Sequence, residues 1–142
     1  MTSLYAPIMQ QIQTTLAGVG AIKAIYAYPT EKVTHYPAAI YFPDTLENTF
    51  ESNEDNLKHY RFKVYVVVGS AQKDQVDIFS DILPNAVDKV IEAFDAAWDG
   101  GTIDGHRVWC LINSGSWTIG QTPEGLEAQA ELTLEFRAVT NT

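Results

Sequence analysis

The residues whose side chains could carry out chemistry are three histidines, one cysteine and a surplus of carboxylates. His35, His59 and His106 are far apart, and none has another at the i, i+3 or i, i+4 spacing that puts two ligands on one helix face. Cys110 is the only cysteine, so the chain has neither a zinc-binding cysteine cluster nor an internal disulfide. We therefore expect no metal, no cofactor and a reducing compartment.

The short motifs that resemble phosphate-binding or catalytic sequences have simpler structural explanations. Gly18 and Gly20 form a G-x-G pair, but no strand precedes them, so the end of a helix is the better interpretation. The sequence Ser114-Gly115-Ser116 lies within a strand pattern, whereas a nucleophile elbow joins a strand to a helix. We predict that the protein is not an enzyme. The alternative is an enzyme with an unrecognised carboxylate site.

The composition is that of a single acidic globular domain, residues 1–142. Hydrophobic residues make up 46% of the chain and charged residues 19%, and the net charge is −9. This charge argues against a protein whose main task is to bind phosphates. The N-terminus has no signal-peptide pattern, and no apolar run approaches the roughly 20 residues that cross a bilayer, so we expect no membrane segment.

The acidic residues are densest between Asp44 and Asp55, a stretch without Lys or Arg. The stretch lacks the spacing of a calcium-binding loop, so solvated carboxylates are favoured over a metal site. Thr45–Glu51 partly alternates and predicts an extended hairpin arm, with Ser52–Asn56 as its polar tip. The acids of this segment are Asp44, Glu47, Glu51, Glu54 and Asp55.

The elements that must position these residues are organised around Tyr60–Val68. This stretch alternates β-branched and aromatic residues with polar ones, which predicts a strand about 30 Å long with one buried face. Leu126–Val139 alternates in the same way and predicts the last strand. If the two strands are neighbours, two acids can pair with two bases across them. These residues are Glu131 and Glu135, and Arg61 and Lys63.

Helical periodicity occurs twice. Apolar residues at every fourth position from Leu4 to Leu16 predict an amphipathic helix of three to four turns. A second helix is predicted over Asp74–Trp98, with a bend or break near Asp81–Pro84.

The remaining strands are predicted at Ile22–Tyr28, at Ala38–Phe42 with Pro43 ending it, and at Arg107–Ile119. Asp104-Gly105 predicts a hairpin turn before the last of these, and Gly115 is expected to mark a bulge or bend within it. The order of elements predicts an α+β domain. It has a mostly antiparallel sheet of five or six strands, with two main helices packed on one face.

Four residues are candidates for a subunit or partner contact. Trp109 and Trp117 lie opposite the apolar face of their strand if no bulge intervenes. Together with Tyr65 and Val67 they would form an apolar patch on the outer face of the sheet, and such patches usually mark protein–protein contacts. The alternative is a second small core under the N-terminal loops.

The order of elements resembles that of a known family. An amphipathic helix leads to a strand of the I-Y-x-Y type and then to the proline-led segment Tyr36–Phe42, YPAAIYF. A long strand, a long helix and a closing alternating strand follow. Over nearly its whole length the chain resembles the tail terminator (tail completion, tail-to-head joining) proteins of long-tailed bacteriophages. Other small phage neck or head-completion proteins share these features, and a non-viral protein-binding module is a further alternative.

The resemblance implies a structural virion protein that forms a ring, commonly a homohexamer. The ring would cap the tail tube, end its polymerisation and join it to the head connector. The implied partners are copies of itself, the tail tube protein and the head–tail connector protein, with genomic DNA passing through without specific binding. The implied location is the virion tail or neck, and the host cytoplasm during assembly. We expect the Asp44–Asp55 segment to face the lumen, where carboxylates would repel DNA phosphates.

Overall fold

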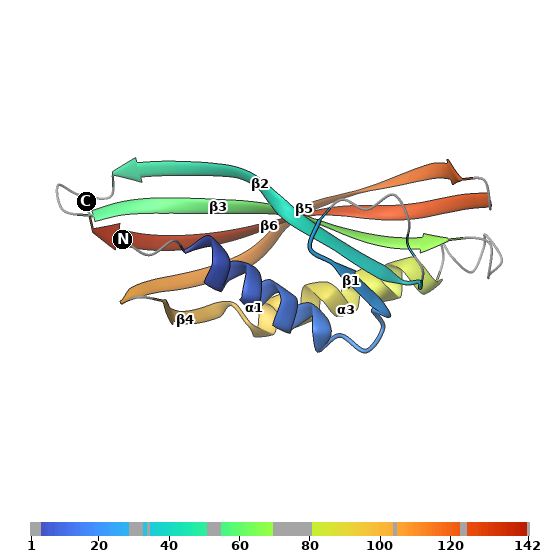
Figure 1. Ribbon diagram of the computed structural model, residues 1–142, viewed down its shortest axis with the longest axis horizontal. Helices are drawn as coiled ribbons and strands as arrows, with labels where there is room; N and C mark the ends of the chain where they lie inside the picture. The colour runs from blue at the N-terminus through green and yellow to red at the C-terminus, as the bar shows by residue number, and fades with distance from the viewer. Residues whose placement is uncertain are drawn as a thin grey trace.

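The fold places one layer of helices against one face of a sheet (Figure 1). The computed structural model describes residues 4–28, 33, 35–50, 55–69, 81–103, 105–122 and 125–141. Within them the elements are α1 (Tyr5–Ala17), β1 (Ala24–Tyr26), β2 (Ala38–Phe50), β3 (Asp55–Gly69), α3 (Leu83–Ala96), β4 (Asp99–Ile103), β5 (His106–Thr122) and β6 (Gly125–Asn141). The strand order is β1-β2-β3-β6-β5-β4, and only the β1–β2 pair is parallel. The predicted α+β class with a mostly antiparallel sheet is confirmed.

Strands β3 and β6 form the centre of the sheet, and both alternate over long stretches, Tyr60–Val66 in β3 and Ala128–Ala138 in β6. They pair antiparallel from Asp55 opposite Asn141 to Gly69 opposite Glu127. Their even-numbered residues from Tyr60 to Val68 and from Ala128 to Ala138 are buried toward the helices. We call this the helix-side face. The odd-numbered residues point to the opposite, outer face, where the predicted pairs of acids and bases form.

Helix α1 covers the sheet with one apolar stripe. The buried residues of this stripe are Leu4, Ile8, Ile12 and Leu16, as the four-residue spacing predicts. Burying such a side chain contributes about 1.5–3 kcal/mol. Tyr5 packs edge-to-face on Tyr60, with ring centroids 4.9 Å apart, and the Tyr41 hydroxyl donates a 2.7 Å hydrogen bond to Gln13. The helix is thereby fixed against β2 and β3.

Helix α3 begins at Leu83, with Pro84 in its first turn. Proline is favoured there because the backbone N–H that it lacks would find no acceptor in the first turn of a helix. The predicted interruption near Asp81–Pro84 therefore coincides with the start of α3. The predicted helical residues 74–80 lie outside the described residues. The buried stripe of α3 consists of Leu83, Ala86, Val87, Val90 and Phe94.

The prediction that Pro43 ends its strand is wrong. Strand β2 continues to Phe50, with one extra residue, Asp44, between the pairs Pro43–Phe62 and Thr45–Arg61. Proline is tolerated because β1 pairs with β2 only as far as Ile40, so one side of β2 makes no ladder with β1 beyond that point. The predicted hairpin arm is thus part of β2. The predicted strand at Ile22–Tyr28 is shorter than expected, Ala24–Tyr26.

The predicted tip of the hairpin arm is also partly wrong. Asp55 and Asn56 already belong to β3, pairing with β6, and Asn56 also lies opposite Phe50. Residues 51–54 lie outside the described part.

Strand β5 contains a bulge that reverses its faces. Ile112 lies opposite Leu134 and Ser114 opposite Thr133, so Asn113 is an extra residue. The bulge is two residues before Gly115, near the place that the sequence predicts. At the other end of β5, Gly105 has a φ of +80°, which suits the predicted hairpin turn. Asp104 lies outside the described residues.

The sheet is longer than the helix layer at both ends (Figure 1). At one end β2 and β3 extend past the start of α1, and we call residues 44–50 and 55–61 the β2–β3 arm. At the other end β5 and β6 extend past α3, and we call residues 114–122 and 125–132 the β5–β6 arm. The last described residue of β6, Asn141, lies at the end of the β2–β3 arm, opposite Asp55.

Candidate interaction surfaces

The four predicted contact residues do not form one patch. After the bulge in β5, Trp117 lies opposite Ala130 on the helix-side face, whereas Trp109 remains on the outer face opposite Arg137. Val67 is only 1% exposed, so it is not part of an open surface. The prediction of a single outer-face patch is therefore wrong, because one extra residue moves Trp117 to the other side of the sheet.

The two residues that do lie on the exposed part of the outer face are far apart. Tyr65 is level with Glu131 of β6 and Trp109 with Arg137, six residues further along, or about 20 Å. The Tyr65 ring stacks on Phe42, with centroids 5.8 Å apart. The Arg107 guanidinium lies 5.6 Å from the centroid of the Trp109 ring. Their role in subunit contacts stays a prediction.

A small buried cluster lies on the outer face around Val67. Ala38, Ile40 and Val67 are buried, yet none belongs to the main core between the sheet and the helices. The Tyr36 ring occupies the space that a side chain at Gly69 would need, and its hydroxyl donates a 3.1 Å hydrogen bond to Glu127. The position of Val67 thus agrees with the alternative interpretation, a second small core.

Further along the outer face, ion pairs converge on Glu135, whose side chain is 3% exposed. His59 Nδ1 and Arg61 Nε each lie 3.0 Å from its Oε1 atom, and Arg137 Nε lies 3.0 Å from Oε2. Lys63 pairs with Glu131 at 2.8 Å. The cross-strand pairs predicted from the alternation of the two strands are confirmed. Arg137 of β6 and His59 of β3 are additional partners of Glu135.

The partners of Glu135 control its ionisation. Burial on its own would raise the pKa of Glu135, but hydrogen bonds and charges from His59 and Arg137 outweigh burial, so the pKa lies below its ordinary value. Glu135 is therefore a carboxylate at neutral pH. Ion pairs of this cluster join β3 to β6 through Glu135, and Arg61 also joins β3 to β2 through Glu47.

The predicted acidic segment is partly neutralised by its neighbours. Glu47 pairs with Arg61 at 3.1 Å, and Asp44 lies 3.9 Å from Lys63. Both bases come from β3, which is adjacent in space although the acidic segment itself contains no base. Asp55 begins β3, while Glu51 and Glu54 lie outside the described residues. That this segment borders a DNA channel stays a prediction.

Each arm carries uncovered apolar side chains on its helix-side face. On the β2–β3 arm these are Leu46, 52% exposed, and Phe50, 81% exposed; on the β5–β6 arm they are Trp117, 56%, and Ile119, 62%. Each of these side chains is at least half exposed, so the helix layer leaves most of its surface uncovered. The sequence reasoning missed the first pair. The signal was present in their spacing. Leu46 and Phe50 are four residues apart in an extended segment, so both side chains are on the same face of the strand.

The β5–β6 arm and α3 enclose an apolar groove, which we call the α3–β5 groove. Its volume is about 260 Å³. Gly115 forms part of its floor, and a methyl group there would lie 2.8 Å from Leu132 Cδ2. The residues that line it are Val87, Ile91, Ile112, Asn113, Ser114, Gly115, Ser116, Trp117, Ala130 and Leu132. Its volume is below the roughly 300–1,000 Å³ of typical small-molecule sites, so it suits a side chain better than a metabolite.

A second hollow lies between the end of α1 and α3. Its volume is about 560 Å³, and its lining includes Gly18, Gly20 and Asn85. The charged groups there are Lys89 and Glu92, an exposed pair 3.5 Å apart on one helix face. Gly18 follows α1 and has a φ of −79°, in agreement with the interpretation that it ends a helix.

Cys110 is buried beneath α3. Its Sγ atom lies 3.2 Å from the Ala97 carbonyl oxygen, and burial, with the Asp95 carboxylate adding to it, raises the pKa of the thiol to about 11. It is therefore a small buried side chain, as the sequence predicts. Among the described residues, no group of three or more His, Cys, Asp or Glu side chains could hold a metal ion. No helix in the described ranges is both long and apolar enough to span a bilayer.

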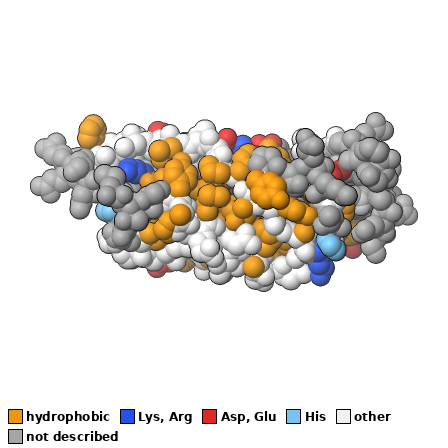
Figure 2. Space-filling model, in the orientation of Figure 1, with side chains coloured by type: hydrophobic (Ala, Val, Ile, Leu, Met, Phe, Trp, Pro, Cys, Tyr) orange, Lys and Arg blue, Asp and Glu red, His pale blue; other side chains and the backbone are white. Residues whose placement is uncertain are grey.

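A third apolar area lies along the β2 edge. Figure 2 shows hydrophobic side chains gathered in the middle of this side, over α1, β1 and β2. Tyr26 and Tyr28 contribute an edge-to-face pair with centroids 6.2 Å apart, and Tyr28 is exposed.

The chain matches no protein-family model, and no curated protein is significantly similar to it.

Proposed function

We propose that the protein is a structural virion component of the phage tail terminator type. In this proposal, copies of the chain form a ring, most simply a hexamer, that caps the tail tube, ends its growth and joins it to the head connector. Its partners are copies of itself, the tube protein and the connector protein. Genomic DNA passes through without specific binding.

The observation that carries the proposal is the pair of unlike apolar surfaces at opposite ends of one elongated domain. A ring needs contacts in which one patch meets a different patch on the next copy. The β2–β3 arm and the α3–β5 groove are two such patches, and neither is covered by the described part of the chain. A symmetric dimer would need only one.

The edges of the sheet supply a second line of support. Within the described residues, the edge of β2 away from β3 has no paired strand beyond Ile40, and the edge of β5 away from β6 has none beyond Cys110, whose N–H donates to the Trp98 carbonyl oxygen. Long unpaired edges are a hazard unless another chain or a cover satisfies them. A ring in which neighbouring copies cover these edges would protect them from aggregation.

The test is the effect of the purified protein on tail tubes. In negative-stain images, tube subunits polymerised with this protein should give shorter tubes that end in a distinct ring. An unrelated acidic protein should leave tube length unchanged. Bare ends and an unchanged length distribution with this protein would contradict the proposal. Genes for a tube subunit and a tape-measure protein immediately downstream would support it. A ring that binds the connector but no tube would favour another neck protein.

A further inference from the structure

We propose that the β2–β3 arm of one copy binds in the α3–β5 groove of the next copy, with Phe50 as its anchor. The inference deepens the proposed function, because it names the contact between neighbouring subunits. It commits to a second copy of this chain as the occupant of the groove.

Shape is the first argument. Phe50 is the most exposed of the large hydrophobic side chains in the described residues, and Leu46 stands on the same face of the arm. The groove offers an open, mostly apolar lining, and the lack of a side chain at Gly115 lets Leu132 pack closely against its floor. A buried aromatic anchor in a pocket of this kind is the usual centre of a protein contact.

Charge is the second argument. Among the described residues on the helix-side face of the arm, Lys58 is the one charged side chain, opposite Asn48. One acidic residue stands at the rim of the groove: Asp88 is exposed, follows the lining residue Val87 and lies one turn from Ile91 in α3. Neither Lys58 nor Asp88 is ion-paired with another described residue. A positive face therefore meets a negative rim, which favours this pairing over arm against arm.

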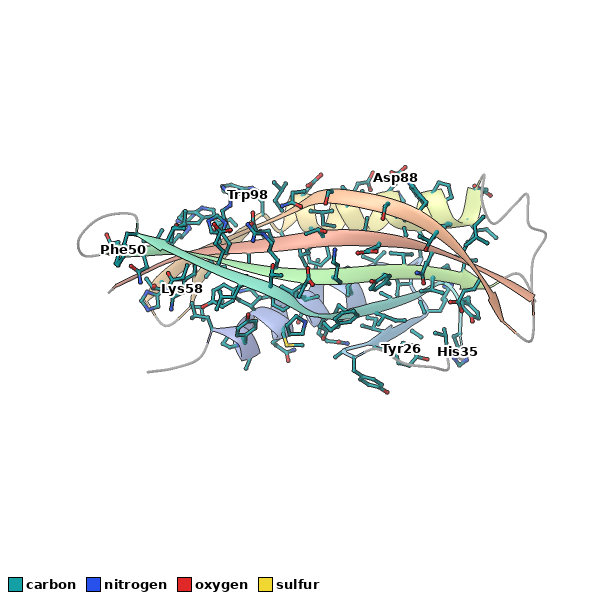
Figure 3. All side chains as sticks on the ribbon, turned by 90° about the horizontal axis from the view of Figure 1, so that it is seen from above. Tyr26, His35, Phe50, Lys58, Asp88 and Trp98 are labelled. Atoms are coloured by element: carbon teal, nitrogen blue, oxygen red, sulfur yellow. The ribbon has the colours of Figure 1, made fainter. Side chains whose placement is uncertain are left out.

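Position is the third argument. Figure 3 shows Phe50 and Lys58 at one end of the molecule and Asp88 beside β5 toward the other end. The arm therefore cannot fill the groove of its own chain. Because the two surfaces differ and lie at opposite ends, the contact repeats from copy to copy and closes into a ring if the rotation between neighbours allows it.

The test is cross-linking between two singly substituted proteins. Asn48→Cys places a thiol on the arm between Leu46 and Phe50, and Ile91→Cys places one in the groove lining, on the α3 side. The native Cys110 is buried and does not compete. On mild oxidation at high protein concentration, the mixture should form a disulfide-linked heterodimer, whereas either protein alone should form little dimer.

Second substitutions then test the two named interactions. Phe50→Ser or Lys58→Glu in the arm protein should lower the heterodimer yield about tenfold. Asp88→Lys in the groove protein should restore the yield with Lys58→Glu. Tyr28→Ser, which changes an exposed aromatic outside both surfaces, is the matched control and should have no effect.

The outcomes separate this inference from the proposed function. No heterodimer, or dimers of the Asn48→Cys protein alone in equal yield, would overturn the inference, even if the protein still caps tail tubes. Unchanged yield with Phe50→Ser would also overturn it. A heterodimer with the charge-swap rescue supports the inference, and it stands even if the assembly is an open chain that caps no tube.

Discussion

Replacing Glu135 by glutamine removes the charge at the centre of the outer-face cluster and keeps the shape of the side chain. The carboxylate is 3% exposed and has three partners within 3.0 Å: His59, Arg61 and Arg137. A hydrogen bond to a charged group contributes about 1.5–3 kcal/mol. Arg137 is 54% exposed and can turn to water, and Arg61 keeps its pair with Glu47. We therefore expect a loss of about 2 kcal/mol, between the values of exposed and buried ion pairs.

The stabilisation by the Glu135 carboxylate should depend on pH. Because the folded-state pKa of Glu135 lies below its ordinary value, the ionised carboxylate stabilises the fold above the unfolded-state pKa. That contribution is lost as the pH falls through the lower, folded-state pKa. The difference in unfolding free energy between wild type and Glu135→Gln should thus be largest near neutral pH and should shrink below about pH 4.

The assay is urea unfolding followed by tryptophan fluorescence at one fixed protein concentration. Glu47→Gln is the matched control, because Glu47 makes one exposed pair with Arg61, and it should cost less than about 1 kcal/mol. A Glu135→Gln protein within about 0.5 kcal/mol of wild type at neutral pH would refute the reasoning. So would a difference that stays constant down to low pH.

Three further predictions concern the core and the groove. Phe94→Ala should cost about 3–5 kcal/mol in urea unfolding because Phe94 is fully buried, while Leu111→Ala, half exposed, should cost less than about 1; equal costs would contradict the assigned core. Cys110 should react with a thiol reagent only after unfolding, since its pKa is about 11, and rapid reaction of the folded protein at neutral pH would argue against its burial. Gly115→Val should cost about 1–3 kcal/mol by crowding Leu132, and an unchanged stability would show that the groove floor yields.

Local alternation predicted the centre of the fold well. Over Tyr60–Val68 of β3 and Ala128–Ala138 of β6 every second residue is apolar, so the buried face and the pairing of the β6 acids with the β3 bases follow from the sequence. A one-residue shift would expose the whole apolar set, which is why the register is so strongly specified. The prediction of α1 succeeded for the same reason, with the apolar stripe at helical spacing.

The errors come from features that are not local. Whether Pro43 ends a strand depends on which strand lies beside it, and that neighbour is far away in the sequence. The bulge at Asn113 inserts one residue and so moves Trp117 to the helix-side face. Val67 is buried in a small cluster on the outer face, near where Tyr36 lies across the end of β3. Each of these depends on tertiary packing, which alternation along one strand does not encode.

The candidate surfaces were predicted least well. Exposed apolar residues on an arm can be recognised only once the extent of the helix layer is known. Phe50 is exposed on the β2–β3 arm, which extends past the start of α1 (Figure 1). The groove requires α3 and the reversed face of β5 together. The sequence predicted an interaction protein, and the fold shows two unlike apolar surfaces that are candidates for its contacts.

Native mass spectrometry over a concentration series, combined with negative-stain images of the same samples, tests the central claim most directly. Joining through unlike surfaces predicts a single closed species at high concentration, most simply a hexamer, with a central hole in end-on views. A protein that stays monomeric at every concentration, alone and with tail tubes, or that forms only a symmetric dimer, would contradict the account.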